Sequence, residues 1–149
     1  MSTADIGEIT EAVEMERAFA IRREVFCREQ GVSAAEEFDG LDAECRTYLI
    51  RLSGAAIGTA RTRPIGSGAV KIERMAILKP YRGRGHGRRL MRRMMGDLQH
   101  EGVDTVILHA QCHAAAVYRR LGFAAEGEEF IEAGIPHVRM TLVLGRAKK

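Results

Sequence analysis

Residues 70–98 read VKIERMAILKPYRGRGHGRRLMRRMMGDL, and the rest of the chain can be placed around them. Residues 70–78 are mostly aliphatic or β-branched, which predicts a β-strand. The end of the segment predicts an amphipathic helix, because arginines occupy one face while apolar residues recur at helical spacing on the other: Leu90, Met91, Met94, Met95 and Leu98. A glycine-rich loop joins the strand to the helix.

This loop has the chemistry of an anion site. Gly83, Gly85 and Gly87 remove three β-carbons just before the helix, so backbone N–H groups can approach a ligand closely. A helix N-terminus has unpaired donors and a partial positive charge, which suit an anion. Arginines at positions 82, 84, 88 and 89 add full charges. We interpret the loop as a pyrophosphate cradle, and the alternative is a strand-to-helix turn with solvated arginines.

The spacing of the loop excludes two common phosphate motifs. A Walker A loop requires Gly-Lys-Ser/Thr, but Arg88 follows Gly87 here. A dinucleotide fingerprint has G-x-G-x-x-G, and the third glycine comes one residue too early for it. The pattern that fits is R-x-x-G-x-G, formed by Arg82, Gly85 and Gly87. It resembles the acetyl-CoA pyrophosphate loop of the GNAT superfamily of N-acetyltransferases.

Length and composition predict one globular domain over residues 1–149, with 46% hydrophobic and 29% charged residues. The first residues lack the basic and apolar regions of a signal peptide, and no apolar run approaches the length of a membrane span. Three cysteines form no C-x-x-C pair. An odd count without a secretory signal predicts a reducing, cytoplasmic location.

The net charge of +3 is unevenly distributed along the chain. Arginines concentrate in residues 82–93 and acids in residues 29–44. A basic region for cofactor phosphates and an acidic region for a cationic substrate would explain this asymmetry. The alternative is two solvated surface patches.

Periodicity and turn residues predict the remaining elements. We expect strands at residues 5–10, 45–52, 55–61, 70–78 and 105–111, with two more within 123–144. We expect helices at residues 14–29, 33–37, 88–102 and 114–121. Ser53 and Gly54 predict a tight hairpin, residues 64–68 a loop, and the long helix a parallel crossover between the strands on either side of it.

Other segments extend the GNAT resemblance over nearly the whole chain. The run ending in Tyr118-Arg119-Arg120-Leu121-Gly122-Phe123 resembles the family's A-x-x-Y-x-x-x-G-F signature. Residues 22–32, 36–39, 109–111 and 130–140 resemble the small YjcF-like or ElaA-like members. The resemblance implies an α/β fold class with an α+β mixed sheet of six to seven strands, a splayed central strand pair and about four helices.

The resemblance also implies a function: acetyl-CoA-dependent transfer of an acetyl group to a primary amine of a small molecule or peptide. It assigns acetyl-CoA binding to two segments and one further residue: Met75, Ala76, Ile77, Arg82, Gly83, Arg84, Gly85, His86, Gly87, Arg88 and Gln111. A backbone N–H near Met75 is the expected oxyanion donor. Many family members have Asn just after the fifth strand, and Gln111 occupies that region here.

Two side chains are candidates for the chemistry. Tyr118 can protonate the departing thiolate, because a phenol stays neutral at working pH; its alternative is a tyrosine packed between helix and sheet. Glu73 can deprotonate the amine, but a carboxylate within an aliphatic strand can equally be a buried ion pair with Arg74 or Lys71. A third alternative is that a low-pKa amine needs no base.

The acceptor side and the partners are less defined by sequence. Glu29, Asp39 and His137 are the candidates for amine recognition. His109, Cys112 and His113 lack the fourth ligand and shared face of a zinc site, so no metal is expected. The alternative functions are a non-catalytic CoA-binding module, nucleic-acid binding, and an acyl-homoserine-lactone-synthase-like acyltransferase suggested by the R-x-x-V-F…D-x-x-D pattern from residue 22. No membrane or nucleic-acid partner is expected, and a homodimer stays open.

Overall fold

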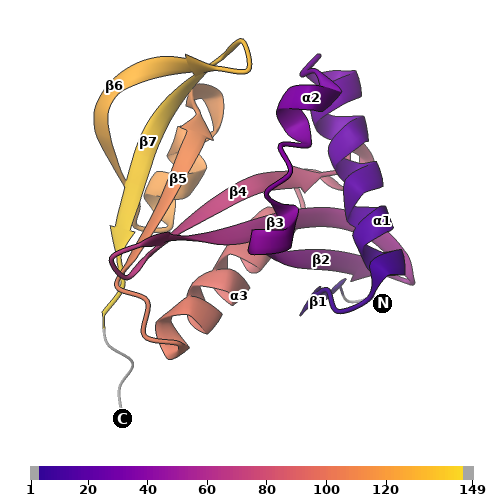
Figure 1. Cartoon of the computed structure of the whole chain (residues 1–149), viewed down its shortest axis with the longest axis horizontal. Helices are drawn as coiled ribbons and strands as arrows, with labels where there is room; N and C mark the ends of the chain where they lie inside the picture. The colour runs from indigo at the N-terminus through magenta and orange to yellow at the C-terminus, as the bar shows by residue number, and fades with distance from the viewer. Residues whose placement is uncertain (1–3, 146–149) are drawn as a thin grey trace.

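A computed structural model describes residues 4–145 and contains a seven-stranded mixed sheet (Figure 1). The spatial order is β1-β2-β3-β4-β5-β7-β6. In chain order the strands are β1 (Ala4–Glu8), β2 (Arg46–Leu52), β3 (Ala55–Gly66), β4 (Ala69–Ile77), β5 (Thr105–Gln111), β6 (Ala124–Glu132) and β7 (Ile135–Val143). Only β4 and β5 pair in parallel, and the other neighbours are antiparallel. The predicted mixed sheet with one central crossover is confirmed.

Four α-helices accompany the sheet, as the sequence predicted. They are α1 (Ala12–Arg22), α2 (Ala34–Glu37), α3 (His86–His100) and α4 (Ala115–Arg120). A π-helix, Arg23–Glu29, continues α1 without a break, and short 3₁₀ turns occupy Asp42–Glu44, Lys79–Tyr81 and Cys112–Ala114. Within residues 4–145, none of these helices combines the length and apolar character needed to cross a membrane.

The helices α1 and α3 cover opposite faces of the sheet (Figure 1), and strand alternation explains how both faces are filled. In β2, Tyr48 and Ile50 point to the cluster that contains the apolar face of α3, while Leu49 points to the cluster under α1. The four apolar residues predicted to share one face of the first helix are all buried there: Ala18, Ile21, Val25 and Phe26.

The two parallel strands separate halfway along their length. Pairing runs only from Ala69↔Thr105 to Ile72↔Leu108. Beyond it, β4 contains a bulge at Arg74, whose φ of 58° lies in the left-handed region. A bulge bends its strand and interrupts pairing. The β5-facing backbone edge of residues 75–77 is therefore left unpaired by β5, and the predicted splayed pair is present.

Two predicted boundaries were wrong. The strand expected to end at residue 61 continues as β3 to Gly66, so residues 64–68 are not a loop. Pro64 is tolerated because β2 has already ended there and only β4 remains beside it. The long helix begins at His86, because Gly85 adopts a left-handed φ of 81° as its N-cap.

Candidate active site

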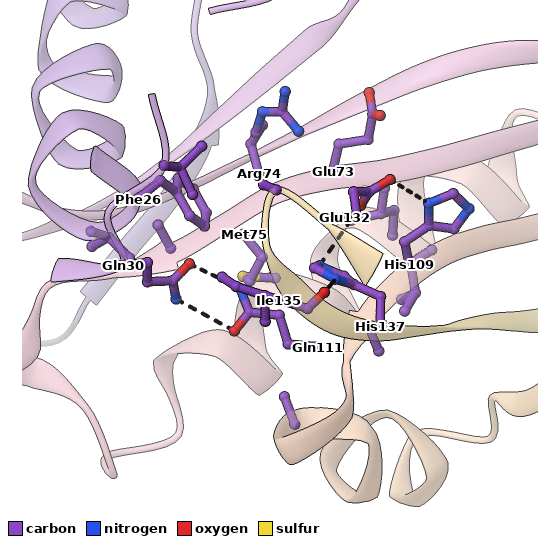
Figure 2. Close-up of a pocket in the computed structure, with 18 of the residues that line it drawn as sticks. Phe26, Gln30, Glu73, Arg74, Met75, His109, Gln111, Glu132, Ile135 and His137 are labelled. Carbon is purple, nitrogen blue, oxygen red and sulfur yellow. Dashed lines mark hydrogen bonds and ion pairs between the residues drawn. The ribbon is translucent and has the colours of Figure 1, made fainter. Parts of the chain in front are cut away.

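A cavity of about 810 Å³ opens where β4 and β5 separate (Figure 2). Most of the predicted site residues line it: Asp39, Glu73, Met75, Ala76, Ile77, Arg82, Gly87, Arg88, Gln111, Tyr118 and His137. The others do not: Glu29, Gly83, Arg84, Gly85 and His86. The loop before α3 and the strand opening thus meet in one space, and the predicted acceptor residues Asp39 and His137 line it too.

The loop before α3 contributes Arg82 to the cavity lining, and the first turn of α3 contributes Gly87 and Arg88. A Cβ added at Gly87 would meet only Ile77 Cγ1, at 3.9 Å, so the space beside this glycine is open. The side chain of His86 instead points inward and is buried, with Arg89 donating to its Nδ1 at 2.8 Å. Burial, and then the charges of Arg89 and Arg84, lower the pKa of His86, so its ring stays neutral at neutral pH.

Arg82 ties the loop to two other elements. Its Nε donates to the Ile77 carbonyl at 2.8 Å, and its Nη2 lies 2.9 Å from the Glu29 carboxylate. Glu29 is therefore engaged with the loop at the end of the π-helix and does not reach the acceptor side of the cavity. An anion in the loop would compete with Glu29 for this guanidinium.

Gln111 is held by partners that the sequence did not reveal. Its amide donates to Gln30 Oε1 at 2.9 Å, and Gln30 Nε2 donates back at 3.4 Å. His113 Nε2 lies 2.6 Å from Gln111 Oε1. The paired amides connect the π-helix to β5 across the cavity (Figure 2). No local sequence signal links two glutamines this far apart.

Tyr118 lies on α4 with its ring partly buried against Phe123, at 6.2 Å between ring centroids. Burial raises the pKa of its hydroxyl, because a phenolate would lose solvation there. The group therefore remains a proton donor across the neutral range. Its position supports both alternatives left open by the sequence, since it packs at the helix–sheet boundary and also lines the cavity.

Glu73 is surrounded by cations. Its carboxylate lies 3.0 Å from Arg63, 3.2 Å from Arg61 and 3.2 Å from Lys71, and its side chain is only 8% exposed. Burial alone would raise the pKa of Glu73, but these three cations lower it to about 2. Such a carboxylate is a poor base at neutral pH. The contacts favour the ion-pair alternative, with Arg61 and Arg63 as partners that the sequence did not reveal. The β3–β4 register places Arg61 opposite Glu73 and Arg63 opposite Lys71, two residues away on the same face.

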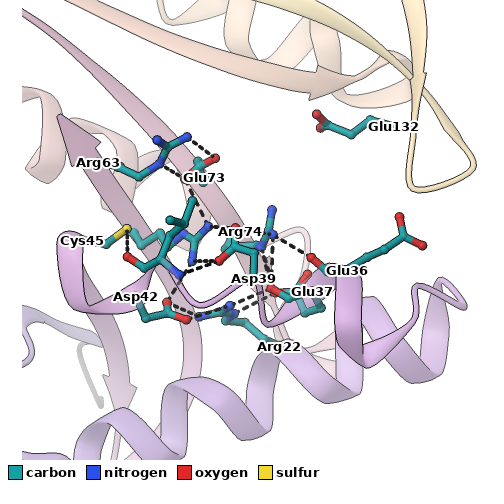
Figure 3. A network of polar contacts seen from close by, with 12 residues as sticks. Arg22, Glu36, Glu37, Asp39, Asp42, Cys45, Arg63, Glu73, Arg74 and Glu132 are labelled. Carbon is teal, nitrogen blue, oxygen red and sulfur yellow. Dashed lines mark hydrogen bonds and ion pairs between the residues drawn. The ribbon is translucent and has the colours of Figure 1, made fainter. Parts of the chain in front are cut away.

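A buried polar network holds the bulge in β4 (Figure 3). Arg74 donates to the Glu37 carbonyl at 3.1 Å and lies 3.1 Å from the Glu37 carboxylate. Arg22, only 1% exposed, contacts Glu37 at 2.8 Å and Asp42 at 2.7 Å. Asp39 forms an ion pair with Arg61 at 2.8 Å, and the hydrogen bond donated by Arg61 lowers the pKa of Asp39. The R-x-x-V-F…D-x-x-D pattern thus builds this network, and Asp39 has little capacity left for an amine.

We expect the free energy of unfolding to decrease at low pH, because the ion pairs of Glu73 are lost when its carboxylate is protonated. The pKa of Glu73 falls from 4.5 to about 2 on folding, so its contribution is complete above pH 4.5 and is lost as pH falls through 2. The shift corresponds to ~3 kcal/mol. Glu73→Gln should lower stability at pH 7 by a similar order and converge with wild type near pH 2, measured by urea unfolding.

The control for this experiment is Glu128→Gln, which changes an exposed carboxylate on β6. Glu37 contributes to the pH dependence of stability with the opposite sign, because burial raises the pKa of its carboxyl. A Glu73→Gln protein whose stability parallels wild type at every pH between 2 and 7 would show that the ion pairs do not stabilise the fold.

Sequence reasoning missed a second cluster at the β6–β7 side of the cavity. Glu132 Oε1 lies 3.1 Å from His109 Nδ1, and Glu132 Oε2 lies 3.7 Å from His137 Nε2. The signal was present in the hairpin around Gly134, because strand alternation places Glu132 and His137 on one face. Among residues 4–145, no group of three or more potential ligands has the arrangement of a metal site.

Comparison with known proteins gives consistent matches over most of the chain. The sequence model described as "Acetyltransferase (GNAT) domain" matches residues 11–144. YyaT of Bacillus subtilis (strain 168) is 39% identical over 145 residues, which cover 95% of this chain and 97% of YyaT. YjcF of the same strain, named as an uncharacterised N-acetyltransferase, is 35% identical over 128 residues, covering 85% and 91%.

Solved structures share the fold. A Lactobacillus plantarum protein described as a candidate N-acetyltransferase superposes with a TM-score of 0.89 at 28% identity, covering 95% of this chain and 99% of its own. Escherichia coli ElaA gives a TM-score of 0.82 at 25% identity, with the same coverage. An aminoglycoside 6′-N-acetyltransferase complexed with coenzyme A gives 0.78 at 13% identity, covering 97% and 99%, which shows a common fold.

Proposed function

Because this chain belongs to the GNAT acetyltransferase family, we propose that it transfers an acetyl group from acetyl-CoA directly to a primary amine of a small molecule or peptide. The similarity to YjcF and ElaA confirms the subgroup that the sequence resembles. The proposal also assigns the protein to the reducing cytoplasm, since Cys27, Cys45 and Cys112 are all free thiols.

One observation carries the proposal: the splayed strands, both ends of the glycine-rich segment at Arg82 and Gly87, and Tyr118 all border the same cavity. Acetyl-CoA supplies an activated acetyl thioester. In this proposal, Gly87 and Arg88 bind its pyrophosphate at the N-terminus of α3. The β4 edge that β5 leaves unpaired at residues 75–77 pairs with the pantetheine amides as an added strand would. Gln111 faces this edge from β5 and is kept in place by Gln30.

The chain's own groups then act on the thioester. A backbone N–H near Met75 stabilises the oxyanion, which is where preorganised donors contribute most. Tyr118 gives its proton to the departing thiolate. Arg82 exchanges Glu29 for the pyrophosphate, because the pyrophosphate carries two negative charges and the Glu29 carboxylate only one.

Thiol release tests the proposed function. Protein is incubated with acetyl-CoA and a panel of alkylamines, polyamines and peptides with a free N-terminus, and free CoA thiol is measured against a sample without amine. We expect amine-dependent release with at least one class of acceptor. Binding of acetyl-CoA without release for any amine would instead support the non-catalytic CoA-binding alternative.

We also expect acetyl-CoA to raise the melting temperature. A ligand present at 100 times its dissociation constant adds about 2.7 kcal/mol when it binds only the native state. Differential scanning fluorimetry with millimolar acetyl-CoA measures the shift, and acetate at the same concentration is the control. An unchanged melting temperature would remove the cofactor assignment.

A further inference from the structure

Three titratable side chains meet in the cavity outside the acetyl-CoA loop. Glu132 ends β6, His137 lies near the start of β7, and His109 lies on β5 one residue beyond the last one paired with β4. Figure 2 shows the Glu132 carboxylate joined to both imidazoles. All three line the cavity that contains Tyr118.

The hydrogen-bond partners of His137 fix its tautomer. Its Nδ1 lies 2.7 Å from the Ile135 carbonyl oxygen, which can only accept, so Nδ1 carries the hydrogen. In the neutral ring Nε2 is then an acceptor, and it faces Glu132 Oε2 across 3.7 Å. A group with several N–H donors could hydrogen-bond to both of these facing acceptors at once. A primary ammonium has three.

His109 orients the carboxylate from the other side. An ionised carboxylate only accepts, so His109 Nδ1, at 3.1 Å, donates to Glu132 Oε1 and leaves Oε2 directed toward His137. This hydrogen bond is the main cause of a lowered pKa for Glu132, and the charge of Lys71 adds to it. Glu132 is therefore charged at neutral pH, which suits it to attract a cation rather than to take its proton.

We propose that Glu132 and His137 form the site that binds and deprotonates the primary ammonium of the acceptor, with His109 as the residue that positions Glu132. The inference rests on the proposed acetyl transfer and names the part of the cavity that receives the amine. It replaces Glu73 in the role of base, because Glu73 is saturated by three cations while His137 keeps a free acceptor nitrogen.

The register of the sheet puts this site beside the expected thioester. His137 is the β7 partner of Gln111, and directly opposed residues of neighbouring strands have Cα atoms about 4.5–5.5 Å apart. Gln111 is the expected pantetheine contact. Lys71 lies 3.2 Å from Glu73 and belongs to the ion pairs around that carboxylate. The other titratable groups that line the cavity are Glu36, Glu37, Asp39, Arg74, Arg82, Arg88, His113 and Tyr118.

The proton and bond changes balance in this arrangement. His137 Nε2 takes one proton from the ammonium, and Glu132 stabilises the resulting imidazolium. The free amine nitrogen forms a bond to the thioester carbon, and the carbon–sulfur bond breaks as the oxyanion collapses. Tyr118 protonates the departing thiolate, and the second proton leaving nitrogen restores Tyr118 through water. His137 releases its proton to solvent, so each cycle yields one amide, one thiol and one proton.

The charges around the cavity also indicate which amines fit. Arg74 is committed to carbonyl oxygens of Glu36 and Glu37 and to the Asp39 carboxylate. Arg82 and Arg88 belong to the acetyl-CoA loop, and Lys71 is paired with Glu73. Each lysine or arginine that lines the cavity within residues 4–145 therefore already has another partner or role. None of them is left to bind a carboxylate of the acceptor. We expect amines without a neighbouring carboxylate to be preferred, for example phenethylamine over phenylalanine.

His137→Asn tests the base most sharply. The asparagine amide can still donate to the Ile135 carbonyl as Nδ1 does, so only the Nε2 acceptor is removed. We expect kcat/KM for phenethylamine to fall about a hundredfold, with loss of the acid limb of its pH profile and unchanged affinity for acetyl-CoA. Glu132→Gln should raise KM for the amine, and it carries the test alone if His137→Asn does not fold.

His109 is tested by rescue. His109→Ala should raise KM for the amine roughly tenfold or more, because a hydrogen bond to a charged group is lost. His109→Asn keeps a hydrogen-bond donor for Glu132 and should return KM most of the way to the wild-type value. If His109 acted only through packing, this substitution would not restore KM. Glu128→Gln, on the exposed part of β6, is the matched control and should behave as wild type.

The outcomes separate this inference from the proposed function. If the wild-type protein acetylates no amine, the acetyl transfer itself is wrong. If the wild type is active but His137→Asn and Glu132→Gln keep its amine kinetics and acid limb, transfer stands and this site is wrong. A preference for phenylalanine over phenethylamine would contradict the assigned class of acceptor.

Discussion

Gly87→Val should abolish acetyl-CoA binding while leaving the fold intact. The glycine lies in the first turn of α3, where backbone N–H groups must approach the pyrophosphate, and a side chain there would occupy the phosphate position. The protein itself leaves room for a β-carbon at this position, which would meet only Ile77 Cγ1 at 3.9 Å. Lost binding would therefore result from a clash between the new side chain and the pyrophosphate, and not from a clash within the fold. Isothermal titration with acetyl-CoA measures the effect.

Gly96→Val is the matched control, because Gly96 lies exposed in the same helix and a Cβ added there would have nothing within 4 Å. Both substitutions change helix propensity by only a few tenths of a kcal/mol. Gly85 is less suitable as a test, since its φ of 81° would strain any other residue whether or not a ligand is bound. Wild-type affinity in a folded Gly87→Val protein would refute the pyrophosphate cradle.

Tyr118→Phe should lower turnover by about 10²–10⁴ while acetyl-CoA affinity changes little. Phenylalanine keeps the ring packing against Phe123 and removes only the hydroxyl, whose pKa burial raises and which therefore holds a proton to give. The loss should shrink for acyl donors with a more acidic thiol, because their departure needs less help from an acid. Steady-state kinetics with two thioesters of different leaving-group pKa measures this dependence.

The matched control is Tyr81→Phe, since Tyr81 lies in the turn before the loop and does not line the cavity. It should retain wild-type turnover. If Tyr118 only packs the helix against the sheet, Tyr118→Phe would show reduced stability and no dependence on the leaving group. Near-normal turnover in the folded variant would mean that water or another group protonates the thiolate.

The parts of the fold that follow from local patterns could be predicted from the sequence. The strand–loop–helix segment of residues 70–98, the crossover to β5 and the buried face of α1 depend on periodicity and glycine placement within a few turns. The end of β3 did not follow from local patterns, because Pro64 is acceptable only where β2 has ended beside it. Such a position depends on the length of a neighbouring strand.

The acceptor side shows the same limit more strongly. Sequence alone does not decide whether Glu73 is a base or part of an ion pair, because Arg61 and Arg63 reach it through the β3–β4 register and not through sequence proximity. Glu132 on β6 and His109 on β5 come together only because β7 lies between their two strands, in the order β5-β7-β6. The pairing of Gln30 with Gln111 needs the π-helix to lie against the splayed strands. Each depends on tertiary placement, which composition and spacing do not contain.

The most direct test of the account follows the acetyl group itself. The protein is incubated with acetyl-CoA carrying a deuterated acetyl group and with the best primary amine from the thiol-release panel, and the products are analysed by mass spectrometry. The account predicts an N-acetylated amine that carries the label, formed in equal amount to free CoA and absent when Gly87→Val protein is used. CoA release without labelled amide, or label found only on the protein, would contradict direct transfer to an amine.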